Sequence, residues 1–172
     1  DESKPKWLTD ADKKKVYADA SGWRFENPKS GATDEILCAV SGLAVSIGSA
    51  DITEIEFIST AFDKSEGGTL SVRVRFNEAV AVTGTPQLTV VNDQRANHTL
   101  SYASGTGSNE LVFSLVIGAA NAATSDGDVL SIGANAMALN GGTVKDNGTS
   151  TNATITNIAG IGTAAGTITV AA

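Results

Sequence analysis

The feature that most constrains this chain is a strict two-residue alternation between Leu70 and Phe76. Every second residue of this stretch is apolar, and the residues between them are Ser or Arg. Because successive side chains of a β-strand point to opposite faces, this pattern places one face in a core and the other in water. Half-buried strands of this kind are typical of antiparallel sheets. The segment therefore predicts a packed β domain.

Similar short segments recur along residues 51–172, separated by clusters of turn-forming residues. The expected strands are 53–60, 69–76, 87–91, 98–103, 110–117 and 129–132, with weaker ones at 136–139, 153–158 and 166–170. Many short strands at this spacing favour a Greek-key β-sandwich. Because no long helical period is present, a parallel α/β fold is disfavoured. We therefore predict an all-β fold for this part of the chain.

The first fifty residues differ from the rest and predict a small α+β arm. Thr9 is a suitable N-cap for a short helix, and Asp10 and Asp12 fall in its first turn, where the helix dipole favours acidic side chains. A turn-rich break at residues 27–33 leads into an apolar strand at 35–40. We divide the chain into an N-terminal docking arm, residues 1–50, and a β-sandwich, residues 51–172.

Large aromatic side chains are concentrated in this arm. Aromatic residues make up 5% of the chain, yet both tryptophans lie within the first 25 residues. They form either a small core for the arm or a set of anchors for a partner, since Trp and Tyr contribute strongly to interfaces. The sequence supports both interpretations equally. The candidate docking residues are Trp7, Leu8, Tyr17, Trp23, Phe25, Leu37 and Val40.

Charge and cysteine content exclude several classes of function. The net charge is -7, with about -1 in residues 1–50 (seven basic, eight acidic) and -6 in residues 51–172 (five basic, eleven acidic). Nucleic-acid binding needs clustered Lys and Arg, so an acidic chain disfavours it. No apolar run has the length of a membrane span, so we expect no membrane insertion. Cys38 is the only cysteine, which excludes an intrachain disulfide, and we expect a buried structural thiol there.

The sequence contains no set of residues that predicts catalysis, and we expect a protein that is not an enzyme and has no cofactor. His98 is the only histidine and has no nucleophile or metal partner in sequence, so we expect it on the surface or on an edge strand. Asp126, Asp128 and Asp146 could offer oxygen ligands to Ca²⁺, but their spacing fits no dedicated loop, and Asp is an ordinary turn former. The expected solvent-facing acids are Glu54, Glu56, Glu66, Glu78 and Glu110.

Several short motifs between residues 53 and 155 occur in an order that suggests a family. The motifs are Phe76-Asn77-Glu78-Ala79-Val80, Val82-Thr83-Gly84-Thr85-Pro86-Gln87-Leu88, Tyr102-Ala103-Ser104-Gly105-Thr106-Gly107-Ser108-Asn109, Asp126-Gly127-Asp128 and Leu139-Asn140-Gly141-Gly142-Thr143-Val144-Lys145-Asp146. In this order they resemble the repeated bacterial immunoglobulin-like domain of large surface and adhesion proteins. This resemblance implies an immunoglobulin-like Greek-key sandwich that serves display or adhesion.

The arm resembles a second group of proteins. Trp7-Leu8-Thr9-Asp10, Gly22-Trp23 and Glu35-Ile36-Leu37-Cys38-Ala39-Val40-Ser41-Gly42-Leu43 are similar to the starts of small structural proteins of tailed bacteriophages. The two resemblances together imply a capsid decoration or head-fibre protein at the virion surface, which docks on the major capsid protein or another virion protein.

Other functions stay open at this point. A homo-oligomer and binding to a host-surface glycan or protein are compatible with the sequence. The main alternative is an immunoglobulin-like module of a bacterial cell-surface adhesin, although tandem arrays show repeats and none is visible here. A carbohydrate-binding module would need exposed aromatic platforms on the sandwich, and no Trp follows Trp23.

Overall fold

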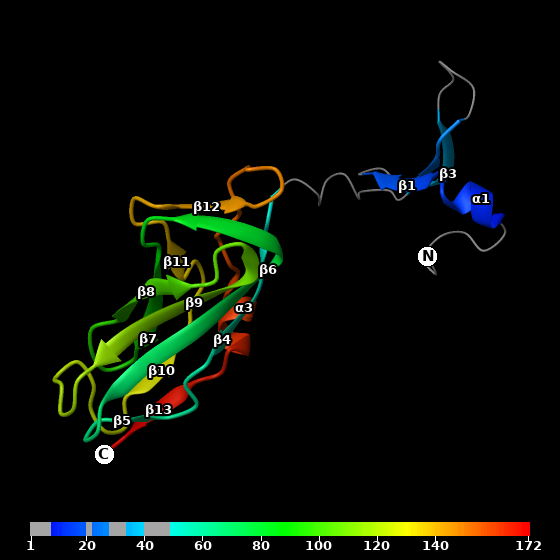
Figure 1. Cartoon of the computed structure of the whole chain (residues 1–172). Helices are drawn as coiled ribbons and strands as arrows, with labels where there is room; N and C mark the ends of the chain where they lie inside the picture. Colours follow the sequence, from blue (N-terminus) through cyan, green and yellow to red (C-terminus); the bar gives the residue numbers. More distant parts are fainter. Residues whose placement is uncertain (1–7, 20–21, 28–33, 40–48) are drawn as a thin grey trace. The chain divides into compact units, whose positions relative to one another are not determined.

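The computed structural model describes residues 8–19, 22–27, 34–39 and 49–172. It divides the chain into two compact units, Asp1–Gly48 and Ser49–Ala172 (Figure 1). We call these the small unit and the β unit. The β unit consists mainly of strands, so the prediction of an all-β fold is confirmed.

The small unit contains a one-turn helix and a three-stranded antiparallel sheet. Its elements are α1 (Asp10–Lys13), β1 (Val16–Asp19), β2 (Gly22–Phe25) and β3 (Glu35–Ala39), with the strands in the order β1-β2-β3. Thr9 caps the helix as predicted, because its Oγ1 accepts a hydrogen bond from the Asp12 amide at 3.2 Å. The predicted strand at 35–40 is confirmed as β3 through Ala39. Strands β1 and β2 were not predicted from the sequence.

The β unit is built on one curled, mixed sheet. Its elements are β4 (Ile52–Phe57), β5 (Phe62–Asp63), β6 (Gly68–Thr83), β7 (Gln87–Asn92), β8 (His98–Ser104), β9 (Ser108–Ile117), β10 (Val129–Ser131), β11 (Met137–Ala138), β12 (Thr143–Asp146), α3 (Ala159–Ala164) and β13 (Ile168–Ala171). The strand order is β12-β6-β9-β8-β7-β10-β13-β5, with β4 added on β6 and β11 on β7. The β13–β5 pair is parallel, whereas the other strand pairs are antiparallel.

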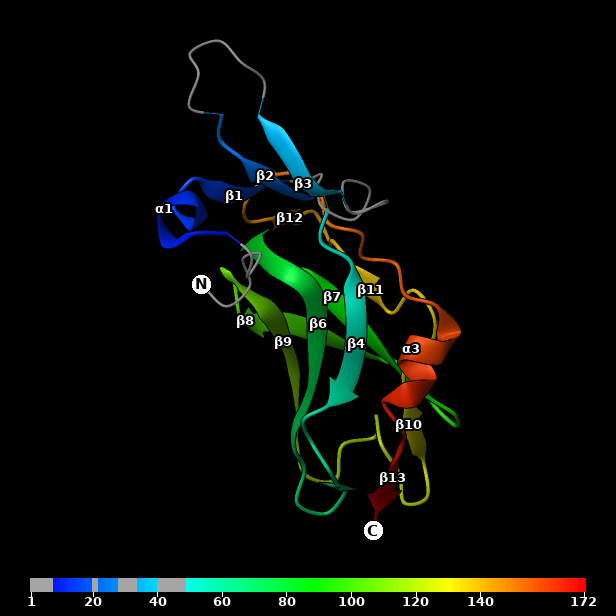
Figure 2. The same ribbon diagram turned by 90° about the vertical axis from the view of Figure 1, so that its right-hand side faces the viewer.

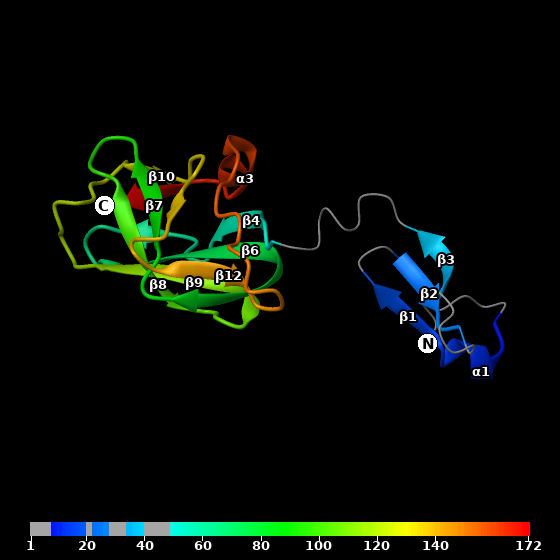
Figure 3. The same ribbon diagram turned by 90° about the horizontal axis from the view of Figure 1, so that it is seen from above.

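The sheet curls so that strands β4, β6 and β9 face strands β7, β10 and β13 across the core (Figures 2 and 3). The alternation predicted around Leu70 is confirmed, because Leu70, Val72 and Val74 are fully buried. Phe113 of β9 is also fully buried, and the ring of Tyr102 meets it edge-on at a centroid distance of 6.1 Å. The core is thus filled mainly by aliphatic side chains from both layers.

Strand β6 extends beyond the predicted end at Phe76. Its first half pairs with β4 and β9, and after a register shift between Arg75 and Val80 its second half pairs with β12. The chain then reverses at Gly84, whose φ is +69° and whose added Cβ would lie 2.8 Å from the Gly142 Cα. Glycine is therefore required at this turn.

The segment 153–158 does not form the predicted strand. It makes an isolated bridge between Asp51 and Thr154, and the chain then enters helix α3, which the sequence did not indicate. Gly162 of α3 lies directly against the backbone of residues 132–133, where an added Cβ would be 2.5 Å from the Gly133 oxygen. Ile161 and Ala165 also pack against the core, so the helix is held both by this close contact and by apolar packing.

Candidate functional site

The candidate docking residues of the small unit fall partly on one face of its sheet. Trp23 and Phe25 are two residues apart on β2, so their side chains share a face. Val16 pairs with Phe25 across the β1–β2 ladder and lies on the same face. Val16 is buried, whereas Trp23 and Phe25 are half-buried. The Lys15 ammonium lies 5.9 Å from the centre of the Phe25 ring. We call Trp23 and Phe25 the aromatic face.

Tyr17 lies on the opposite face of this sheet, opposite Arg24 in the register. Its side chain is 41% exposed, and its hydroxyl donates a hydrogen bond to the carboxylate of Asp34. This bond, followed by a second one from the Asn27 amide at 3.2 Å, lowers the pKa of Asp34. Tyr17 therefore links β1 to the residue that precedes β3, and it does not extend the aromatic face.

The remaining candidate docking residues are Leu8, Leu37, Trp7 and Val40. Leu8 and Leu37 are half-buried. Leu37 lies where the β2–β3 register skips a residue, because Trp23 pairs with Cys38 and Arg24 with Ile36. Trp7 and Val40 lie outside the described residues, so their predicted role stays a prediction. The buried thiol expected at Cys38 likewise lies outside the described side chains.

A ladder of charges crosses the outer face of the β unit. Glu54 and Glu56 of β4 and Glu110 of β9 flank Arg73 and Arg75 of β6. Arg75 contacts Glu110 at 2.8 Å and Glu54 at 2.7 Å, and these partners raise the pKa of Arg75. The Nε and Nη2 of Arg73 both donate hydrogen bonds to one carboxylate oxygen of Glu56, Oε1. The outward direction of the three glutamates is confirmed, but their pairing was missed because it depends on strand register.

A buried polar cluster closes one end of the core. Asp128 accepts hydrogen bonds from Asn92 Nδ2 at 2.9 Å and from the Ser125 amide at 2.9 Å, and Arg95 Nε lies 3.2 Å from the same oxygen. Asn92 and Asp128 are both at most 4% exposed. His98 belongs to this region, since burial lowers its pKa while the charge of Asp128 acts in the opposite direction.

The prediction of a surface or edge position for His98 is wrong. Strand β8 lies between β7 and β9, and His98 is only 4% exposed. The signal was present in the sequence, because His98 shares the two-residue phase of Leu100, which is fully buried. The imidazole Nε2 is buried and has no hydrogen-bond partner among the described residues.

A second acidic group lies where β12 ends. Asp146 is 2% exposed, and its Oδ1 accepts hydrogen bonds from the Gly148 amide at 2.8 Å and the Thr149 amide at 2.6 Å. The bond from Thr149 is the main cause that lowers the pKa of Asp146. Loss of solvent, and then the neighbouring carboxylates of Asp146 and Asp51, raise the pKa of Glu78.

The three aspartates considered for calcium do not converge. Asp126 is exposed, Asp128 belongs to the buried polar cluster, and Asp146 holds the turn after β12. In the described part of the chain, no group of three or more His, Cys, Asp and Glu side chains is arranged to hold a metal ion.

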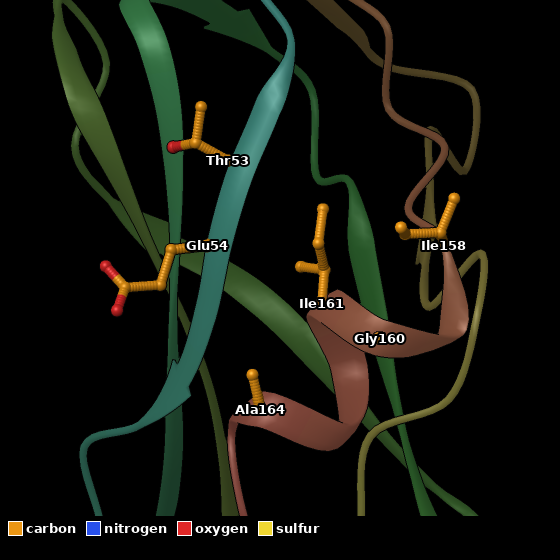
Figure 4. Close-up of a pocket in the computed structure, with 6 residues that line it drawn as sticks. All are labelled: Thr53, Glu54, Ile158, Gly160, Ile161 and Ala164. Atoms are coloured by element: carbon orange, nitrogen blue, oxygen red, sulfur yellow. The ribbon is translucent and has the colours of Figure 1, made fainter.

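A shallow hollow of about 440 Å³ lies between β4 and helix α3 (Figure 4). It is lined by Thr53, Glu54, Ile158, Gly160, Ile161 and Ala164. Ile158 is 72% exposed, so the rim on the helix side is apolar. Glu54 on the opposite side is already paired with Arg75.

The chain has no match among models of known protein families, curated proteins or solved structures. Among the helices in the described ranges, none is long and apolar enough to cross a membrane.

Proposed function

We propose that this protein is a non-enzymatic structural protein of a bacteriophage virion, a capsid decoration or head-fibre protein at the virion surface. In this proposal the small unit docks on the major capsid protein or another virion protein, and the β unit is displayed. The function is binding without turnover, and it requires no cofactor.

The aromatic face of the small unit is the observation that carries this proposal. Trp23 and Phe25 keep part of their surface exposed, and aromatic side chains carry a large apolar area. Burying such area against a partner contributes about 25 cal/mol per Å², from which the costs of association are subtracted. Display in many copies would add avidity. Half-buried aromatic residues on a small sheet are therefore suitable anchors for docking.

For the β unit we propose an immunoglobulin-like Greek-key sandwich. The spatial order β6-β9-β8-β7 supports this assignment. Strands β7, β8 and β9 follow each other as antiparallel neighbours, and β6, which precedes them in the chain, lies beside β9. This order supports the proposed Greek key. Such a domain suits display, because its loops gather at the two ends of the sandwich.

The alternative function is an immunoglobulin-like module of a bacterial cell-surface adhesin. In that case the ligand is a host-surface glycan or protein, and no capsid carries the chain. Self-association into a homo-oligomer is compatible with both functions. The native assembly distinguishes them, because only a decoration protein copurifies with a capsid in many symmetric copies.

The test uses particles assembled with the full chain or its variants, and it measures the copies of the protein per particle. Trp23→Ala combined with Phe25→Ala should lower occupancy at least tenfold, which corresponds to about 1.4 kcal/mol of lost binding free energy. The matched control is Val116→Ala, because Val116 is 76% exposed on β9 of the other unit. Full occupancy of the double variant, or absence of the wild-type chain from particles, would contradict the proposal.

A further inference from the structure

The buried polar cluster joins two loops at one end of the β unit. The first loop, residues 93–97, connects β7 to β8, and the second, residues 118–128, connects β9 to β10. Asn92 holds both: its Oδ1 accepts the Arg95 amide at 3.1 Å, and its Nδ2 donates to Asp128 at 2.9 Å and to the Ala123 carbonyl at 3.5 Å. The Arg95 guanidinium also pairs with Asp128 from outside. We call this arrangement the loop latch.

His98 lies on β8 beside the loop latch, close enough to Asp128 for its charge to act on the imidazole. It pairs with Val90 in the β7–β8 register, and Val90 and the next inward residue of β8, Leu100, are fully buried. Its Nε2 has no hydrogen-bond partner among the described residues, and the same is true of the Thr124 hydroxyl in the second loop. Because these two buried polar atoms already lack partners, adding a charge in this region while the loops stay closed carries a large desolvation penalty.

The charged groups at this end come from three segments of the described chain. Asp128 precedes β10 and is held by Asn92, Ser125 and Arg95. Arg95 lies in the β7–β8 loop with its side chain 42% exposed. Asp93, which follows β7, directs its carboxylate to the Val129 amide at 2.7 Å. All three donors bind one oxygen of Asp128, Oδ2, and the positive charge of Arg95 offsets the negative charge that Asp128 could offer to a proton on His98.

We propose that the loop latch is an acid-sensitive device: protonation of His98 opens the two loops while the core of the β unit stays folded. The reason is geometric. A neutral imidazole fits its enclosed position, whereas an imidazolium needs either water or a free acceptor for its added proton. Opening the loops supplies water to that proton without disturbing the β6–β9 ladder.

The direction of the pH dependence follows from burial. With the loops open, His98 has an ordinary pKa of about 6.5, whereas burial lowers its pKa in the closed form. The open form therefore binds protons more strongly, and its population rises as the pH falls below about 6.5. For one linked proton the population of the open form rises at most about tenfold per pH unit, until the pKa of the closed form is reached.

The experiment is amide hydrogen exchange on the full chain between pH 7.5 and 5.0, with each rate divided by the intrinsic rate at that pH. The Ser125 and Arg95 amides report on the latch, because they bond to Asp128 and Asn92 respectively. Their protection should fall several-fold over this range. Amides of the β6–β9 ladder should keep their protection, and this pH range lies above the ordinary titration of carboxyl groups.

Two variants make the test specific to His98. His98→Leu removes the titrating group and keeps its bulk, and His98→Gln does the same with a polar side chain if the first variant folds poorly. Either should abolish the acid-induced loss of protection at Ser125 and Arg95. The matched control is Glu78→Gln. It removes another titratable group, one whose pKa is raised, and it should leave the acid response at Ser125 and Arg95 intact.

Three results would overturn the proposal. The first is protection at the latch that does not change with pH in the wild-type chain. The second is an acid response that persists in both His98 variants. The third is a uniform loss of protection that includes the β6–β9 ladder, which would mean that acid unfolds the β unit as a whole.

Discussion

The two units of this protein bury their large side chains to different degrees. In the β unit, Leu111 and Phe113 of β9 are fully buried among aliphatic neighbours from both layers. In the described part of the small unit, Val16 is buried, while Trp23 and Phe25 keep part of their surface in solvent. The β unit thus obtains its folding free energy from its own core. In the described part of the small unit, by contrast, part of the aromatic surface stays in contact with solvent.

A second contrast concerns charged residues within the β unit. On the outer face, Arg73 and Arg75 form ion pairs that water still reaches. At the end of the core, Asp128 is enclosed and held by three donors. Charged side chains of the same kind therefore interact more strongly at the end of the core than on the outer face, because burial removes the screening that water provides.

The largest expected effect comes from a substitution in the core of the β unit. Phe113→Ala should lower its free energy of unfolding by about 3–5 kcal/mol, because it removes a fully buried ring and its edge-on contact with Tyr102. Urea unfolding of the full chain measures this change. Trp23→Ala, in the separate unit, should shift the same transition by less than about 0.5 kcal/mol. A comparable loss from Trp23→Ala would mean that the two units depend on each other for stability.

An intermediate effect is expected at the turn after β12. Asp146→Asn should lower the stability of the β unit by less than the loss of the Phe113 ring, since it weakens charge-assisted bonds from the Gly148 and Thr149 amides. The lowered pKa of Asp146 means that its stabilisation is present above the ordinary carboxyl value and is lost as the pH falls through its folded pKa.

Unfolding measured from pH 7 to pH 2 checks both parts of the Asp146 prediction. Asp146→Asn should flatten the decline in stability below about pH 4. Asp126→Asn is the control, because Asp126 is an exposed aspartate of another turn. An equally steep acid decline in Asp146→Asn would show that other carboxylates govern it.

The smallest effect is expected on the outer face. A double-mutant cycle with Arg73→Gln and Glu56→Gln should give a coupling of less than about 1 kcal/mol, since both side chains are about one-third exposed. The coupling should decrease further in 1 M salt. A coupling above about 2 kcal/mol, unchanged by salt, would mean that these ion pairs are as strongly shielded from water as the buried polar cluster.

Much of the fold could be predicted from the two-residue alternation. It located the strands around Leu70, Leu88, Leu100 and Phe113, because each carries enough apolar residues in one phase to define a buried face. It failed at helix α3, a short helix in which Gly162 makes a close backbone contact and Ile161 packs against the core. The alternation predicts a buried face most clearly where a strand is long enough to carry several apolar residues in one phase.

The candidate sites were harder to predict. The aromatic residues were named from composition, but their distribution over the two faces of the small sheet depends on the β1–β2 register. His98 was expected on the surface or on an edge strand because no nucleophile or metal partner accompanies it in the sequence, although its own phase points inward. Polar residues in a core are identified by their partners, and those partners come from distant parts of the chain.

The sequence by itself determined the acidic charge, the strand-rich β unit and the concentration of tryptophan near the amino terminus, because these follow from composition and short-range periodicity. Tertiary structure alone decided that Asn92, Arg95 and Asp128 meet near His98, and that three strands align the Arg–Glu ladder. Those contacts join residues far apart in the chain. Their geometry depends on how the sheet curls, and no local pattern encodes that.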